Sequence, residues 1–183
     1  MNNQLSPVSW QTLFKKSAVW GVWLFLLALL QTSFFSVIRP FGAVPELVLP
    51  AVIAIGIYDK ERTGAIAGIV GGYMIDAVGG VGLSLSPPIY MLCGAVSALL
   101  VYSVLNRGWF SWFIMTVPSL ILSFAVSLIS VYLTVPNPNF EFGPLVTGVL
   151  LPFMLSSLSV GIVVYLLTKL IWAKYFDNRE MTG

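Results

Sequence analysis

Charged residues are so sparse in this chain that they leave long uncharged stretches between them. The four longest of these runs are 17–38, 77–106, 108–140 and 142–168. A helix that crosses the hydrocarbon core of a bilayer needs about 20 mainly apolar residues. Because lipid satisfies no backbone polar group, such segments form helices or closed barrels. The runs therefore predict an all-α, polytopic membrane protein.

The composition supports this prediction. Charged residues make up 9% of the chain and hydrophobic residues 58%, whereas soluble domains carry about 25% charged residues. The chain has no histidine, which is the commonest metal ligand, and its single cysteine, Cys93, excludes an internal disulfide. We expect no metal, no cofactor and, with a net charge of +2, no nucleic-acid partner.

Two shorter uncharged runs, 47–58 and 63–75, flank the charged sequence Asp59-Lys60-Glu61-Arg62. Four consecutive charges belong in water or among headgroups. With their neutral flanks, the two runs therefore predict an antiparallel helical hairpin. The sequence as a whole predicts one domain, 1–183, with six membrane-spanning helices near 17–38, 41–58, 63–80, 87–105, 111–135 and 143–171.

The basic residues are distributed unequally between the two sides of this topology. One side carries Lys15, Lys16, Lys60, Arg62, Arg107, Lys169, Lys174 and Arg179. The other side, with the 39–46, 78–87 and 136–142 connections, carries only Arg39. Basic residues favour the cytoplasmic side, so both termini are predicted to be cytoplasmic. The first run is too long for a signal peptide and predicts an uncleaved span.

A series of small residues follows the charged turn. Gly64, Gly68 and Gly72 are spaced by four, and Asp76 continues the series. Residues four apart share one helix face, and glycines there let a second helix approach closely. We favour packing within the chain as the use of this face. Docking of another subunit is the alternative.

Two acidic residues, Glu46 and Asp76, lie toward the same side of the predicted hairpin, together with Arg39. Pro45-Glu46-Leu47 is typical of a helix start, where a carboxylate meets the positive end of the helix dipole. A second possibility is an outward-facing polar pocket, in which Arg39 neutralises one carboxylate. Carboxylates are costly in lipid, so we predict that both face protein or an outer cavity.

Asp76 itself has three possible uses. It is a helix-end carboxylate wetted from outside, a hydrogen-bond acceptor for a neighbouring helix, or part of a proton relay or ligand site. The chain lacks histidine, a metal-ligand cluster and a nucleophile motif, so we predict no catalytic residue and no enzyme activity.

The order of several motifs resembles the rod shape-determining protein MreD family. These motifs are Trp23–Gln31, then Pro45-Glu46-Leu47, then the glycine series to Asp76, then Gly79, Gly80 and Gly82. The family often has aspartate in place of Glu46. The segment Gly148–Pro152 followed by a basic end also resembles the last helix of that family.

The resemblance implies a multi-pass protein of the bacterial inner membrane that takes part in cell-wall elongation. Its partner would be MreC and, through it, the glycosyltransferase RodA, a class B penicillin-binding protein and MreB filaments. The resemblance also implies a bundle similar to the substrate-capture (S) components of energy-coupling factor vitamin transporters.

Two other functions remain open. An S-component that binds a vitamin would have a similar fold, although the first span is dominated by leucine, phenylalanine and tryptophan rather than small residues. An enzyme for a lipid-linked substrate would need Asp76 or Glu46 as its acid or base. The sequence favours a non-enzymatic scaffold.

Overall fold

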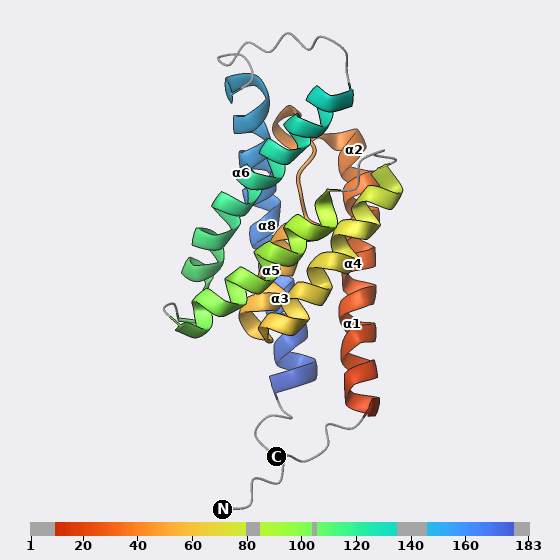
Figure 1. The fold of residues 1–183 in the computed structure, drawn as a ribbon, viewed down its shortest axis with the longest axis vertical. Helices are drawn as coiled ribbons and strands as arrows, with labels where there is room; N and C mark the ends of the chain where they lie inside the picture. Colours follow the sequence, from red (N-terminus) through yellow and green to blue (C-terminus); the bar gives the residue numbers. More distant parts are fainter. Residues whose placement is uncertain (1–9, 80–84, 104–105, 135–145, 178–183) are drawn as a thin grey trace, which may run out of the picture.

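The computed structural model describes residues 10–79, 85–103, 106–134 and 146–177, and over these residues the protein is all-α, without strands. Six helices in this part of the chain exceed ten residues (Figure 1): α1 Trp10–Leu29, α3 Val48–Tyr58, α4 Glu61–Gly79, α5 Ser86–Ser103, α6 Trp109–Thr134 and α8 Leu151–Trp172. Shorter helical turns are η1 Leu30–Phe34, α2 Phe35–Ile38, η2 Pro40–Gly42, η3 Val146–Leu150 and η4 Ala173–Asp177.

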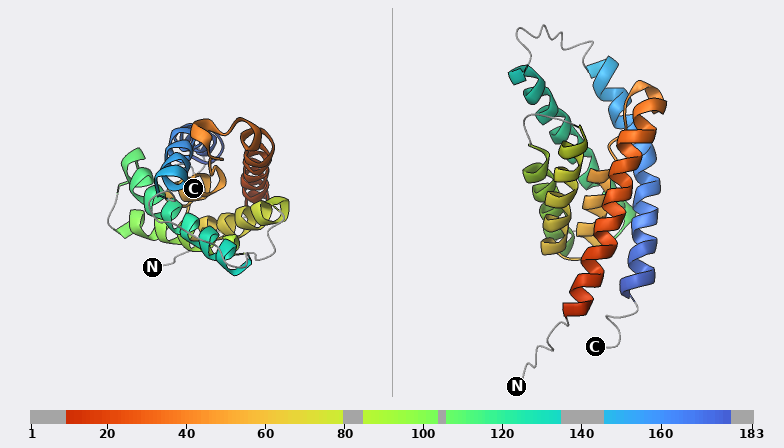
Figure 2. Two further views of the ribbon diagram at one scale, coloured as in Figure 1. Left: turned by 90° about the horizontal axis from the view of Figure 1, so that it is seen from above. Right: turned by 90° about the vertical axis from the view of Figure 1, so that its right-hand side faces the viewer.

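Helix α3 forms the centre of the bundle. It contacts α1, α4, α5, α6 and α8, and all eleven of its residues are buried. Seen from above, the longer helices lie around it (Figure 2). An apolar sequence with no polar face suits this position, because a helix that is hydrophobic all round has to be covered all round.

Four helical stretches of the described residues are long and apolar enough to cross a membrane: Phe14–Ile38, Ser86–Ser103, Trp109–Ile129 and Val146–Tyr175. The chain is therefore a polytopic membrane protein. The predicted span 41–58 is wrong at its start, because the helix begins only at Val48. At 1.5 Å per residue α3 is about 16 Å long, roughly half the hydrocarbon thickness of a bilayer.

The beginning of α1 and the end of α8 lie at the same end of the bundle, and we call this the terminal end (Figure 1). The α3–α4 turn with Lys60 and the α5–α6 turn with Arg107 face toward it, whereas α2 lies at the opposite end. Which end is cytoplasmic stays a prediction. The predicted connection 136–142, Gly80, Gly82 and Arg179 lie outside the described residues.

Helices α4 and α5 lie backbone against backbone. A Cβ atom added at Gly64, Gly68 or Gly72 would lie within 3 Å of the α5 backbone, at Gly94, Tyr90 and Pro87 respectively. Gly94 in turn faces Gly64, and Gly56 of α3 also abuts Gly94. Only residues without side chains permit three helix backbones to meet in this way.

Candidate functional site: a buried polar cluster at the start of α3

The chain enters the bundle through residues 43–47, which belong to no helix. Pro45, Glu46 and Leu47 are buried. Non-helical backbone inside a membrane protein must find its hydrogen-bond partners within the protein, because lipid supplies none. The side chains around Glu46 meet this need and form what we call the Glu46 cluster, which consists of Gln31, Glu46, Tyr90, Ser123 and Ser157.

Gln31 satisfies the first backbone groups of α3. It lies in the π-helical turn η1, and its side-chain oxygen accepts hydrogen bonds from the N–H groups of Leu47, at 2.8 Å, and Val48, at 3.4 Å. The first N–H groups of a helix have no partner within the helix. Gln31 therefore caps α3 from another element, and the capping role predicted for Glu46 falls to this residue.

The Glu46 carboxylate instead accepts two side-chain hydrogen bonds. Its Oε1 atom accepts a short one from the hydroxyl of Tyr90 on α5 and another, of 3.0 Å, from the hydroxyl of Ser123 on α6. The backbone N–H of Glu46 donates to the hydroxyl of Ser157 on α8, at 2.9 Å. Three transmembrane helices therefore converge on one residue of the entering segment.

Asp76 lies apart from these contacts but on the same side of α5. Its Oδ2 atom accepts a hydrogen bond of 3.3 Å from the backbone N–H of Ser86, the first residue of α5. Ser86 precedes Tyr90 by four residues, so the two carboxylates meet α5 one turn apart. Both are buried, with exposed fractions of 5% for Glu46 and 8% for Asp76, so neither faces lipid.

Arg39 does not join this cluster. Its side chain is exposed, and its Nε atom donates to the Ser36 carbonyl at 3.0 Å. The predicted neutralisation of Glu46 or Asp76 by Arg39 is therefore wrong. Arg39 has a left-handed backbone at the end of α2, with φ 43°, and this turn directs the chain across the bundle toward α8.

The glycine face of α4 is occupied within the chain, because Gly64, Gly68 and Gly72 lie against α5. This geometry corresponds to the packing use of the face and leaves no room there for a helix of another subunit. Asp76 ends the same face and contacts the start of the same helix. The glycine series and Asp76 therefore both serve the contact between α4 and α5.

A second polar contact joins elements at the terminal end. Lys16 of α1 forms an ion pair with Asp59, the residue directly after α3. Close by, the hydroxyls of Tyr58 and Tyr165 share a hydrogen bond, and the Tyr58 ring lies 5.5 Å from that of Trp172. Cations at a helix C-terminus interact favourably with its dipole. Both ends of α3 are thus held by side chains from surrounding elements.

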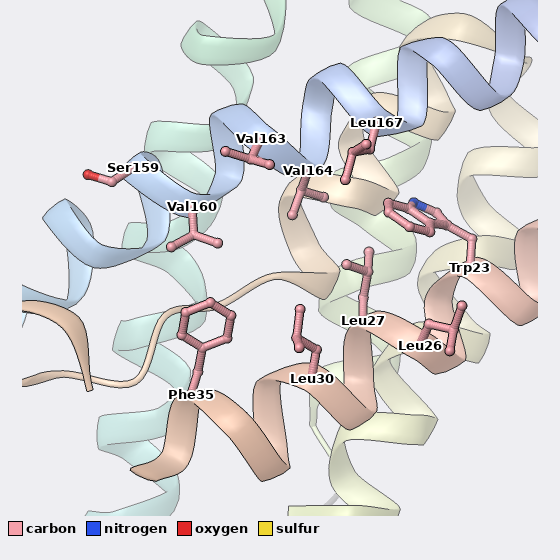
Figure 3. A pocket seen from close by; sticks show the side chains of 10 residues that line it. All are labelled: Trp23, Leu26, Leu27, Leu30, Phe35, Ser159, Val160, Val163, Val164 and Leu167. Carbon is pink, nitrogen blue, oxygen red and sulfur yellow. The ribbon is translucent and has the colours of Figure 1, made fainter. Parts of the chain in front are cut away.

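A groove opens between α1 and α8 on the outside of the bundle. It has a volume of about 610 Å³ and is lined almost entirely by apolar side chains (Figure 3): Trp23, Leu26, Leu27, Leu30, Phe35, Ser159, Val160, Val163, Val164 and Leu167. Several of these side chains are exposed at the surface, among them Leu26, Val163 and Leu167. The groove therefore lies in contact with the hydrocarbon of the membrane.

The described residues contain no group of three or more potential metal ligands. In the Glu46 cluster, the hydroxyl and amide groups are engaged with the carboxylate or with the start of α3. The arrangement holds an irregular segment in a fixed position inside the bundle. The hydrogen bonds of the cluster are made to the Glu46 carboxylate and to backbone N–H groups of the same chain.

No family model, no curated protein and no solved structure matches this chain. Functional conclusions therefore rest on the residues and their geometry.

Sequence reasoning missed most partners in the cluster. Gln31 is the only amide side chain in the uncharged run 17–38, and this isolation was a usable signal, since a lone amide in a span needs a partner. Tyr90, Ser123 and Ser157 carried no comparable signal. Tyrosine and serine are frequent throughout the chain, and nothing in their spacing relates them to Glu46.

Proposed function

We propose that this protein is a non-enzymatic subunit of the bacterial cell-wall elongation machinery. It resides in the inner membrane and scaffolds MreC and, through it, RodA, a class B penicillin-binding protein and MreB. The proposal rests first on the order of motifs between Trp23 and Asp76, which resembles the MreD family. No single motif of that segment is specific to the family. The structural role of the motifs therefore has to support the resemblance.

One observation supports the proposal most: residues that carry the resemblance fall at two contacts that position α3, α4 and α5. Gln31 and Glu46 together hold the start of α3. The glycine series and Asp76 bring α4 and the start of α5 together. Motifs that each position neighbouring helices are expected to mark a fold, and thus a family, more reliably than motifs without such a role.

A scaffold acts through its surface, and the surface of this protein suits contact with other membrane helices. Exposed large apolar side chains occur on α1, α4, α5, α6 and α8, including Val22, Tyr73 and Tyr102. The polar groups of the Glu46 cluster face inward and are engaged there. Function by binding a protein partner requires no further chemistry from these groups.

The experiment is a pull-down of the tagged protein from native membranes in mild detergent, with partners identified by mass spectrometry. We expect MreC as the main partner, with RodA and the penicillin-binding protein in smaller amounts. Depletion of the protein should convert rod-shaped cells to spheres. An untagged strain and a tagged, unrelated six-span protein serve as controls for detergent-induced association.

The opposing result is recovery of an ATPase and a transmembrane coupling subunit of a vitamin transporter. That result would replace the scaffold by the S-component function. If MreC is recovered, tryptophan substitutions at exposed positions of α4, such as Ile66, Ile69 and Tyr73, would locate the contact. Gly68 is unsuitable for this purpose because it faces α5.

A further inference from the structure

The groove between α1 and α8 is bounded by two polar contacts between the elements beside it. Toward the terminal end, the indole Nε1 of Trp23 donates to the hydroxyl of Thr168, at 3.1 Å. Toward the α2 end, the hydroxyl of Ser156 donates to the carbonyl of Pro40. From Ser156 to Thr168 a helix rises about 18 Å. These two contacts therefore mark the length of the groove.

Between these contacts, apolar side chains of the two helices leave a space open toward lipid. Leu27 and Leu30 of α1 and η1 lie opposite Val160 and Val164 of α8 (Figure 3). Leu27 and Val164 are buried at its base. Since α3 is fully buried, the groove lies in the outer layer of helices and does not expose α3.

A cation lies beyond the α2 end of the groove. Arg39 follows the groove residue Phe35 by one helical turn, and its backbone N–H donates to the Phe35 carbonyl at 3.1 Å. Its side chain is exposed. In the described residues one ion pair is present, between Lys16 and Asp59. Within this part of the chain Arg39 therefore has no carboxylate partner. It is also the single basic residue between Lys16 and Lys60.

We propose that this groove binds one phospholipid, with an acyl chain along α1 and α8 and the phosphate at Arg39. The guanidinium group is suited to phosphate, because its planar N–H donors pair with two oxygens at once. The lipid belongs to the leaflet at the α2 end, which is the outer leaflet in the predicted topology. The inference does not depend on the proposed function.

The shape of the groove favours a lipid chain over a protein helix. A helix is a rigid cylinder with a diameter of about 10 Å. It fits poorly into a furrow lined by side chains as different in size as Trp23, Ser159 and Val163. A flexible hydrocarbon chain can follow it along its whole length, and the charge at one end fits an anionic headgroup.

The test is native mass spectrometry of the full-length protein, purified in detergent and incubated with palmitoyl-oleoyl phosphatidylglycerol. We expect one phospholipid that resists collisional release. Val163→Trp fills the groove and should abolish this adduct. Ile162→Trp is the matched control, since Ile162 is the exposed neighbour of Val163 on α8 but does not line the groove, and it should retain the lipid.

A second pair of measurements tests the headgroup. Arg39→Gln should weaken retention of phosphatidylglycerol by about tenfold, because a charge-assisted contact is lost, and Arg39→Lys should restore part of it. Dioleoylglycerol, which has no phosphate, should bind equally to the wild type and to Arg39→Gln.

Equal lipid retention by Val163→Trp and Ile162→Trp would overturn the proposal. So would unchanged phosphatidylglycerol binding in Arg39→Gln. A lipid-free dimer that disappears in Val163→Trp would overturn it as well, and would assign the groove to a second copy of the chain. The far-ultraviolet circular dichroism of each variant should match that of the wild type, which excludes misfolding as the cause of lost binding.

Discussion

Two helix boundaries in this bundle are built in opposite ways. Helices α4 and α5 meet backbone to backbone, because glycines occupy the contact face at every fourth position. Helices α1 and α8 are separated by leucine, valine and phenylalanine side chains and enclose a groove. Both boundaries are apolar, yet only the first leaves no space between its helices.

The difference shows that residue size, more than hydrophobicity, sets helix distance within a membrane. Lipid tails are as apolar as leucine, so apolar side chains gain little by leaving lipid for a neighbouring helix. Close packing of backbones gains dispersion contacts that a lipid chain does not match as well. The glycine boundary should therefore be sensitive to small changes, and the groove boundary should tolerate larger ones.

The largest effect is expected at the glycine boundary. In Gly68→Ala the new methyl group would overlap the Tyr90 carbonyl of α5, and overpacking of this kind costs about 1–3 kcal/mol of unfolding free energy. Unfolding by dodecyl sulfate in mixed micelles, followed by circular dichroism, measures the loss. Gly21→Ala is the control, because no atom lies within 4 Å of the added Cβ and alanine favours helix by about 1 kcal/mol. Equal stability of the two variants would contradict the comparison.

The next largest effect is expected in the Glu46 cluster, which holds the start of α3. Tyr90→Phe removes one of the two hydroxyl donors to the Glu46 carboxylate, while Ser123 still donates to it. The loss should therefore be that of one hydrogen bond, about 1 kcal/mol. The same micellar unfolding assay applies. Tyr102→Phe is the matched control, since Tyr102 is 92% exposed on the same helix. A loss of equal size in the control would refute a specific role for Tyr90.

A smaller effect is expected where the groove boundary is closed. Trp23→Phe keeps an aromatic ring but loses the hydrogen bond to Thr168, and bonds of this kind between membrane helices average about 0.6 kcal/mol. Stability should fall by about that amount. Trp109→Phe, at an exposed ring, should change nothing measurable. Double-mutant cycles with Thr168→Val would separate the bond from the packing, and a coupling energy of zero would contradict the assignment.

The smallest effect should occur inside the groove itself. Val163→Leu adds one carbon at a position that is 54% exposed, and substitutions at such positions usually change stability by less than about 0.5 kcal/mol. This near-neutral result, beside the loss in Gly68→Ala, would establish the contrast between the boundaries. A destabilisation above 1 kcal/mol would show that the groove is as tightly specified as the glycine contact.

The sequence sufficed to predict the main architecture. Uncharged runs indicated the long helices, and the charges Asp59-Lys60-Glu61-Arg62 indicated the tight turn between α3 and α4, where the helices end and begin at Tyr58 and Glu61. Glycine spacing identified the close-packed face of α4. These features depend on local composition or on one helix face, and both can be read from a single stretch of chain.

The nature of α3 could not be read in this way. Hydropathy measures how apolar a segment is, and it does not distinguish a helix surrounded by lipid from one surrounded by protein. The start of α3 at Val48 depends on Gln31, Tyr90, Ser123 and Ser157, which come from four other elements. Their convergence is a property of the assembled bundle, and no local pattern encodes it.

The central position of α3 has a consequence for biosynthesis. Glu46 precedes its partner Ser157 by 111 residues, so the ribosome delivers the irregular segment long before the helix that receives its N–H group. During that interval residues 43–58 cannot settle stably in lipid, and they need shelter from the insertion machinery or from a wetted interface. Helix α8 thus completes the site that receives the start of α3, so α3 can take its buried position only after α8 has been made.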